Sequence, residues 1–241
     1  KVSQFIVRQK FFVILISMII VISAASGLPK TKFSSDYRIF FSDDNENLKA
    51  FEDLQATFTR SDNVMFVLAP KDGQVFTQNN LAMIEALTEE AWQLPYSTRV
   101  DSITNYQHTI AEEDDLLVDN LVSDALERSD QELEFAKFVA LNEPSLVNRL
   151  IAEKADVTAI NISMEMPGIN PSQEPPEIAL AAYAMQNQFN KQYPDMKIYL
   201  AGQIIVDNAF KEASIYDLTH IVPLALLITL LCIALYMSYL L

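Results

Sequence analysis

Residues 221–241 read IVPLALLITLLCIALYMSYLL, and this stretch decides how the rest of the chain is interpreted. It contains no Asp, Glu, Lys or Arg. As an α-helix it would extend roughly 32 Å, which is enough to cross the hydrocarbon core of a bilayer. A polar segment, residues 207–219, is predicted to be a lead-in helix that follows a short extended run ending at Ala201-Gly202. The sequence therefore predicts a lead-in helix and a membrane span over residues 207–241.

A second apolar run, residues 11–28 (FFVILISMIIVISAASGL), lies near the other end of the chain. As a helix it would extend about 27 Å, close to the thickness of the hydrocarbon core. It also resembles a secretory signal, with a basic start, an apolar middle and small residues at 23–27. Its length and the presence of the second run favour a membrane anchor. Both interpretations place residues 1–10 in the cytoplasm and Ser34 onward on the far side, as the basic residues before the run predict.

The charge of the chain is concentrated between the two apolar runs. All 32 acidic residues and 12 of the 17 basic residues lie in Asp36–Asp217, which leaves that block with a net charge of −20. Binding to nucleic acid is unexpected, because phosphate contacts require clustered Lys and Arg. The single cysteine, Cys232, lies inside the apolar run, so no internal disulfide is expected.

The block between the apolar runs shows a strand–helix–strand pattern twice. The first unit is a strand at 63–69, a helix at 77–94 and a strand at 99–103. The second is an alternating strand at 156–165, a helix that Pro175-Pro176 opens and Pro194 ends, and a strand at 197–201. Two such units predict an α+β fold of the ferredoxin-like split βαβ type, with helices on one face of a mainly antiparallel sheet.

Residues 105–155 separate the two units, and we interpret them as a helical insertion. The patterns Thr109–Glu112 and Ser129–Glu132 each match a capping box, and they predict helices over 112–127 and 130–141. A shorter helix is predicted over 146–153. The insertion concentrates apolar residues that the sheet does not need, and Phe135 and Phe138 are candidates to line a path for a hydrophobic substrate. Ordinary core packing is the competing interpretation of these side chains.

Sequence signals of an enzyme are absent. The two histidines, His108 and His220, have no Cys or His at metal-ligand spacing, and the four glycines form no phosphate-binding loop. The acids at 43–46 lack the Gly and Glu that a calcium-binding EF-hand loop requires, and they are better explained as a helix cap. We therefore expect no catalytic residues, no cofactor and no metal.

Several local patterns, taken in order along the chain, resemble the N-terminal half-repeat of exporters of the resistance-nodulation-division (RND) superfamily. The lipid- and hopanoid-exporter-like branch is the most similar. The resemblance covers nearly the whole chain and rests on the order and spacing of the matching segments. These are Asp36-Tyr37-Arg38, Val75-Phe76-Thr77 with Asn80-Leu81, Arg99 through Asn105, and Ala201-Gly202 through Asn208-Ala209-Phe210 and Asp217-Leu218 to Val222-Pro223-Leu224.

The resemblance implies a multi-pass protein of the bacterial inner membrane. It implies a porter domain at 29–206, with residues 29–219 in the periplasm, and proton-coupled export of hydrophobic or amphiphilic molecules such as lipids or drugs. The expected partners are membrane lipids, a hydrophobic small-molecule substrate and the remainder of a longer transporter chain, with other copies of the chain as a further expectation. The residues of a proton relay would lie in later membrane helices, because neither apolar run carries Asp, Glu, Lys or Arg.

A bacterial receptor is the alternative from a different functional class. A two-span sensor or adhesion protein also carries an anchor, an extracytoplasmic ligand-binding α/β domain and a second span. The sequence after Leu241 separates the two hypotheses. A receptor continues into a cytoplasmic signalling domain, whereas an exporter continues through further spans and repeats the whole pattern.

Overall fold

The structure is a computed structural model that describes residues 8–27, 41–42, 44–57, 62–112, 115–170 and 173–240. The chain forms two compact units, Lys1–Ser34 and Ser35–Leu241. Leu28, at the end of the predicted first span, and Asp36-Tyr37-Arg38 lie outside the described residues.

The first unit contains one apolar helix, α2 (Lys10–Ala25). Large side chains such as Phe11, Met18 and Val21 are more than half exposed. The predicted helix is therefore confirmed over most of its length. At 16 residues it extends about 24 Å, which is shorter than a typical hydrocarbon core, so its crossing of a membrane stays a prediction.

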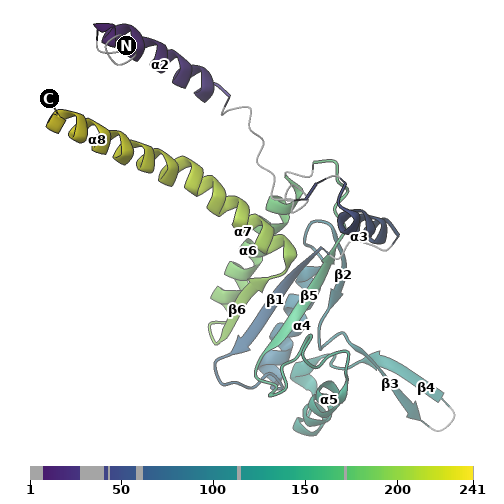
Figure 1. Cartoon of the computed structure of the whole chain (residues 1–241). Coiled ribbons are helices and arrows are strands. Elements are labelled where there is room, and N and C mark those ends of the chain that lie inside the picture. Colours follow the sequence, from purple (N-terminus) through teal and green to yellow (C-terminus); the bar gives the residue numbers. More distant parts are fainter. Residues whose placement is uncertain are drawn as a thin grey trace. The chain divides into compact units, whose positions relative to one another are not determined.

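Four strands of the second unit form one antiparallel sheet, as Figure 1 shows. They are β1 (Asn63–Pro70), β2 (Ser97–Asp101), β5 (Thr158–Met164) and β6 (Met196–Ala201), in the order β2-β5-β1-β6. Phe66 of β1 is paired with Ile160 of β5 on one side and with Leu200 of β6 on the other. The predicted mixed α+β fold with a mainly antiparallel sheet is confirmed.

Helices α4 (Gln78–Ala91) and α6 (Glu174–Gln192) connect β1 to β2 and β5 to β6. Thr77 caps α4 by accepting a hydrogen bond from the Asn80 backbone N–H at 3.2 Å, and prolines occupy the first turn of α6, as predicted. Burial alternates along β1, so that every second side chain faces the helices. The inward faces of the strands and helices form one core, which includes Val64, Phe66, Leu68, Leu81, Ile84, Leu87, Ile160, Ile162, Ile178, Ala182 and Phe189.

The insertion lies between β2 and β5, and the prediction that it is all helical is wrong. Residues predicted as a helix over 112–127 belong to a hairpin of β3 (Gln107–Glu112) and β4 (Asp115–Asn120), followed by a 3₁₀ turn, η3 (Ala125–Glu127). Glu112 and Asp115, which pair with each other across the two strands, resemble in sequence the acidic first turn of a helix, and cross-strand pairs such as Thr109–Val118 override that local pattern. Thr109 is therefore a strand residue and not a helix cap.

The second half of the insertion contains one α-helix, α5 (Asp130–Asn142). It matches the helix predicted over 130–141. The short helix predicted over 146–153 is absent, and turns with two isolated bridges, Val147–Ile151 and Ile151–Thr158, replace it. Pairing with the start of β5 supplies backbone partners that a short isolated helix would lack.

Before the sheet, α3 (Glu46–Thr57) begins at the helix cap predicted for residues 43–46, and the Asn45 side chain caps it by accepting a hydrogen bond from the Leu48 backbone N–H at 3.0 Å. After the sheet, β6 leads into α7 (Gln203–Tyr216), a π-helical turn, η4 (Asp217–Ile221), and α8 (Val222–Leu240). The helix starts at Gln203, four residues before the predicted lead-in.

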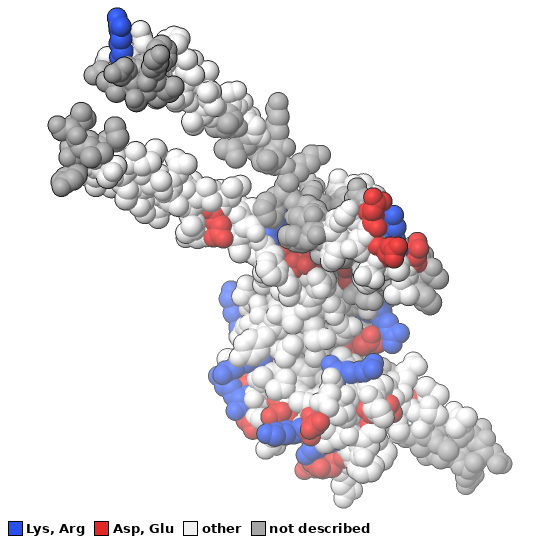
Figure 2. Space-filling view, viewed as in Figure 1, with Lys and Arg blue, Asp and Glu red and all other residues white. Residues whose placement is uncertain are grey.

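Helix Gln203–Ile233 is long and apolar enough to cross a membrane, and its apolar stretch is not buried against the protein. It is the one helix of the described residues that meets both conditions. In the view of Figure 2, α8 is white along its described length, whereas red and blue side chains are spread over the folded block.

Candidate functional site

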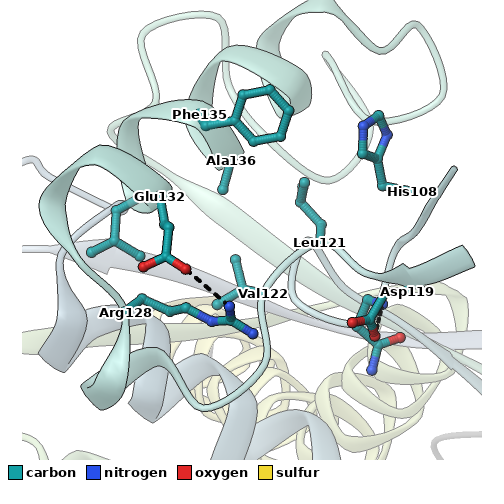
Figure 3. A pocket seen from close by; sticks show the side chains of 10 residues that line it. His108, Asp119, Leu121, Val122, Arg128, Glu132, Phe135 and Ala136 are labelled. Atoms are coloured by element: carbon teal, nitrogen blue, oxygen red, sulfur yellow. Dashed lines mark hydrogen bonds and ion pairs between the residues drawn. The ribbon is translucent and has the colours of Figure 1, made fainter. Parts of the chain in front are cut away.

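A cleft of about 220 Å³ lies where the hairpin meets α5 (Figure 3). Strands β3 and β4, the segment after β4 and the first turns of α5 supply its walls. Its lining combines apolar side chains with a histidine, an arginine and two carboxylates. The lining residues are His108, Asp119, Asn120, Leu121, Val122, Arg128, Glu132, Leu133, Phe135 and Ala136.

A buried polar loop fixes the hairpin to the sheet. The Asn105 side chain accepts a hydrogen bond from the Ser102 backbone N–H at 2.8 Å and donates one to the Val100 carbonyl at 2.8 Å. The loop carbonyl of Thr104 then accepts a hydrogen bond from the Val122 N–H at 3.1 Å. These bonds hold Val122, which is almost fully buried, as part of the cleft floor.

A capping box orients the other wall of the cleft. The Glu132 carboxylate accepts a hydrogen bond from the Ser129 backbone N–H at 2.7 Å, and the Ser129 hydroxyl accepts one from the Glu132 N–H at 3.4 Å. This is the capping box predicted at Ser129. Arg128 Nη1 donates to Glu132 at 3.1 Å, and Arg128 Nε donates to the Ser123 carbonyl at 2.8 Å. The Ser129 backbone bond, the Ser129 hydroxyl and Arg128 together lower the pKa of Glu132 to about 2.

The 3₁₀ turn η3 is tied to the main core through Glu85 of α4. The Glu85 carboxylate accepts a hydrogen bond from the Ala125 backbone N–H at 3.0 Å, and Ala125 is fully buried. Partial burial raises the pKa of Glu85, and the nearby Asp124 adds to that effect, while the Ala125 bond opposes it. One of the bonds that attach the insertion to the domain is therefore accepted by a carboxylate whose pKa burial raises.

The mouth of the cleft is formed by two rings and a carboxylate. The His108 and Phe135 rings pack edge to face, with their centroids 6.1 Å apart and their planes at 65°. In Figure 3 Phe135 and His108 lie on one side of the cleft and Asp119 lies below His108. Asp119 is the cross-strand partner of His108. Asp119 accepts a hydrogen bond from the Asn120 N–H at 2.7 Å, and Phe135 is 52% exposed.

The structure separates the two candidate residues of the substrate path. Phe135 lines the cleft, whereas Phe138 is 63% exposed and is not part of the lining. His108, Asp119 and Arg128 were not predicted as site residues. Only the cross-strand register of the hairpin brings His108 and Asp119 together, and that register was hidden once the segment was interpreted as a helix.

The groups in the cleft suit contact chemistry: apolar packing, hydrogen bonding and ion pairing. Among the residues that the structure describes, no group of three or more His, Cys, Asp or Glu is placed to hold a metal ion. In sequence comparisons, neither a protein-family model nor a curated protein matches this chain.

Proposed function

We propose that the chain is the N-terminal part of a proton-coupled exporter of the RND type that moves hydrophobic or amphiphilic molecules out of a bacterial inner membrane. In this proposal residues 11–28 and 221–241 span the membrane. Residues 29–206 form a ferredoxin-like porter domain, and residues 29–219 face the periplasm.

The proposal rests mainly on one observation: a long helix with an exposed apolar stretch directly follows the last strand of the sheet. Strand β6 ends at Ala201, and the chain continues from Gln203 as a helix with no break before Ile233. Side chains such as Leu224, Leu226 and Leu230 are more than half exposed. Removing a leucine side chain from water is worth about 1.5–3 kcal/mol, so a run of such residues favours a lipid environment strongly.

The order of elements in the sheet supports the same proposal. Two strand–helix–strand units with the strand order β2-β5-β1-β6 correspond to the β-α-β-β-α-β arrangement of ferredoxin-like domains. The insertion lies between the two units and adds no strand to the four-stranded sheet. The cleft at the hairpin then provides a contact for cargo through Phe135.

The receptor alternative has one observation in its favour, because a cleft on an extracytoplasmic domain also suits a ligand sensor. Sequencing the gene beyond the codon for Leu241 distinguishes the two functions. Further spans and a second copy of the sheet pattern are expected for an exporter. A single cytoplasmic signalling domain after Leu241 would contradict the exporter hypothesis and support the receptor.

The topology is tested by labelling single cysteines. In a Cys232→Ser background, Gln9→Cys and Glu90→Cys place thiols before the first apolar run and on the exposed surface of α4. A membrane-impermeant maleimide added to spheroplasts is expected to label the cysteine at 90, and to label the cysteine at 9 only after lysis. Equal labelling of both positions in intact spheroplasts would contradict a membrane crossing between them.

A further inference from the structure

We propose that the cleft at the base of the hairpin binds small organic cations that carry an apolar or aromatic group. The proposal deepens the proposed function by naming the class of cargo, and it rests on that function only for the statement that the bound cation is cargo. The binding itself follows from the charges, the rings and the size of the cleft.

The charged groups that line the cleft leave one carboxylate uncompensated. Arg128 and Glu132 are paired at 3.1 Å, and the Ser129 backbone and hydroxyl also donate to Glu132. Asp119 has no ion pair within the described residues, and its hydrogen bond from the Asn120 N–H leaves the other carboxylate oxygen available. By the convention that counts histidine as neutral at pH 7, the lining carries a net charge of −1 from Asp119, which favours a cation over an anion.

Aromatic and aliphatic groups lie beside that carboxylate. The half-exposed ring of Phe135 packs edge to face with the His108 ring, and Leu121 and Val122 form an apolar floor. A cation over the face of an aromatic ring is attracted by the ring quadrupole, and a quaternary ammonium has apolar methyl groups that also suit the floor. A strongly hydrated metal ion would gain nothing from these surfaces.

The size of the cleft limits the part of a ligand that it encloses. About 220 Å³ is below the roughly 300–1,000 Å³ of pockets that enclose drug-sized molecules. The cleft therefore accommodates a head group or a fragment, and a longer apolar tail would extend beyond it. The net charge of −20 over Asp36–Asp217 attracts cations toward the surface and repels anions.

Binding is measured on the full chain in nanodiscs of zwitterionic phospholipid, by ligand-observed NMR, with empty nanodiscs as the blank. The probe is benzyltrimethylammonium, and benzylsulfonate is the anion of similar shape. We expect the cation to bind weakly and the sulfonate to bind more weakly still. Tighter binding of benzylsulfonate would overturn the proposal and make Arg128 the centre of an anion site.

Variants of two phenylalanines on α5 test the role of the ring. Phe135→Ala is expected to weaken binding of the cation by about 2- to 30-fold, the range of a cation–π contact. Phe135→Leu keeps apolar volume at an exposed position and is expected to weaken binding to a similar extent. Phe138→Ala is the matched control and should leave binding unchanged. Equal losses at both positions, or none at Phe135, would overturn the proposal.

Variants of two acids test the role of the carboxylate. Asp119→Asn is expected to weaken binding by up to about fivefold, with a smaller effect at high salt. Glu90→Gln makes the same change in net charge at a residue of α4 that does not line the cleft, and it should have little effect. If the chain spans the membrane as proposed but does not bind the cation, the cation site is refuted and the exporter proposal stands. If the chain binds the cation but fails the topology test, the cation site stands and its role in export is refuted.

Discussion

Replacement of Gly202 by alanine tests the junction between the sheet and the apolar helix. Gly202 has φ +101° and ψ 162°, a conformation that is essentially restricted to glycine. A Cβ at this position would lie 2.6 Å from the Asn63 carbonyl oxygen and 3.0 Å from the Val64 Cα. Both neighbours are backbone atoms of the central strand β1, so they cannot move aside as a side chain would.

The expected cost of Gly202→Ala has two parts. The backbone conformation contributes about 1–3 kcal/mol, and the crowding against β1 contributes about 1–3 kcal/mol more. Gly73→Ala is the matched control, because Gly73 also has positive φ (+69°) but nothing lies within 4 Å of the added Cβ. That control is expected to cost only about 1–2 kcal/mol, the penalty for the left-handed conformation.

The assay is urea unfolding of the detergent-solubilised chain, followed by the fluorescence of Trp92, the only tryptophan. Trp92 lies at the end of α4 in the folded block and is half exposed, so its emission reports on the loss of the core. The free energy of unfolding should fall more for Gly202→Ala than for Gly73→Ala. Equal losses in the two variants would refute the close approach of Gly202 to β1.

Two carboxylates near the cleft are expected to give opposite pH dependences. Because burial raises the pKa of Glu85 in the folded state, its contribution to stability declines as pH rises above the unfolded value of about 4.5. Glu85→Gln keeps an acceptor for the Ala125 N–H. The difference in melting temperature between this variant and the unsubstituted chain should therefore favour the variant more at pH 7 than at pH 4. Because the pKa of Glu132 is lowered to about 2, its contribution is present above pH 4.5 and is lost as pH falls toward 2. Glu132→Gln should therefore lose less melting temperature than the unsubstituted chain as pH falls from 4.5 to 2. Thermal unfolding measured at a series of pH values checks both expectations.

The sheet and its two helices were predictable from sequence because local pattern and tertiary packing agree there. Residues 63–69 form a nearly continuous apolar run, and residues 156–165 alternate with a period of two. Thr77 and Pro175-Pro176 mark the helix starts: Thr77 is the N-cap of α4, and the two prolines lie in the first turn of α6. Where each local preference supports the same fold, the element boundaries follow within a few residues.

The hairpin was not predictable in the same way, because its local signals compete with those of a helix. Glu112-Glu113-Asp114-Asp115 suits the first turn of a helix, and Leu116-Leu117-Val118 suits either structure. The deciding contribution is pairing between residues 107–112 and 115–120, which a pattern of single residues does not show. The same error hid the cleft, since His108 and Asp119 meet only through that pairing. Phe138 was selected on apolar character alone, and helical phase places it outside the lining.

The apolar helix is fixed to the sheet at one end by bonds that involve a single side chain. Asn63, at the start of β1, accepts a hydrogen bond from the Gln203 N–H at 3.0 Å and donates one to Asn161 of β5 at 2.7 Å. Its carbonyl is also the atom that excludes a side chain at position 202. After the 14 residues of α7, the π turn Asp217–Ile221 replaces the regular α-helical bonding with a looser pattern. We expect a tilt of α8 relative to the sheet to be accommodated at the π turn, because a change at Gly202 would break the bond that ties Gln203 to β1.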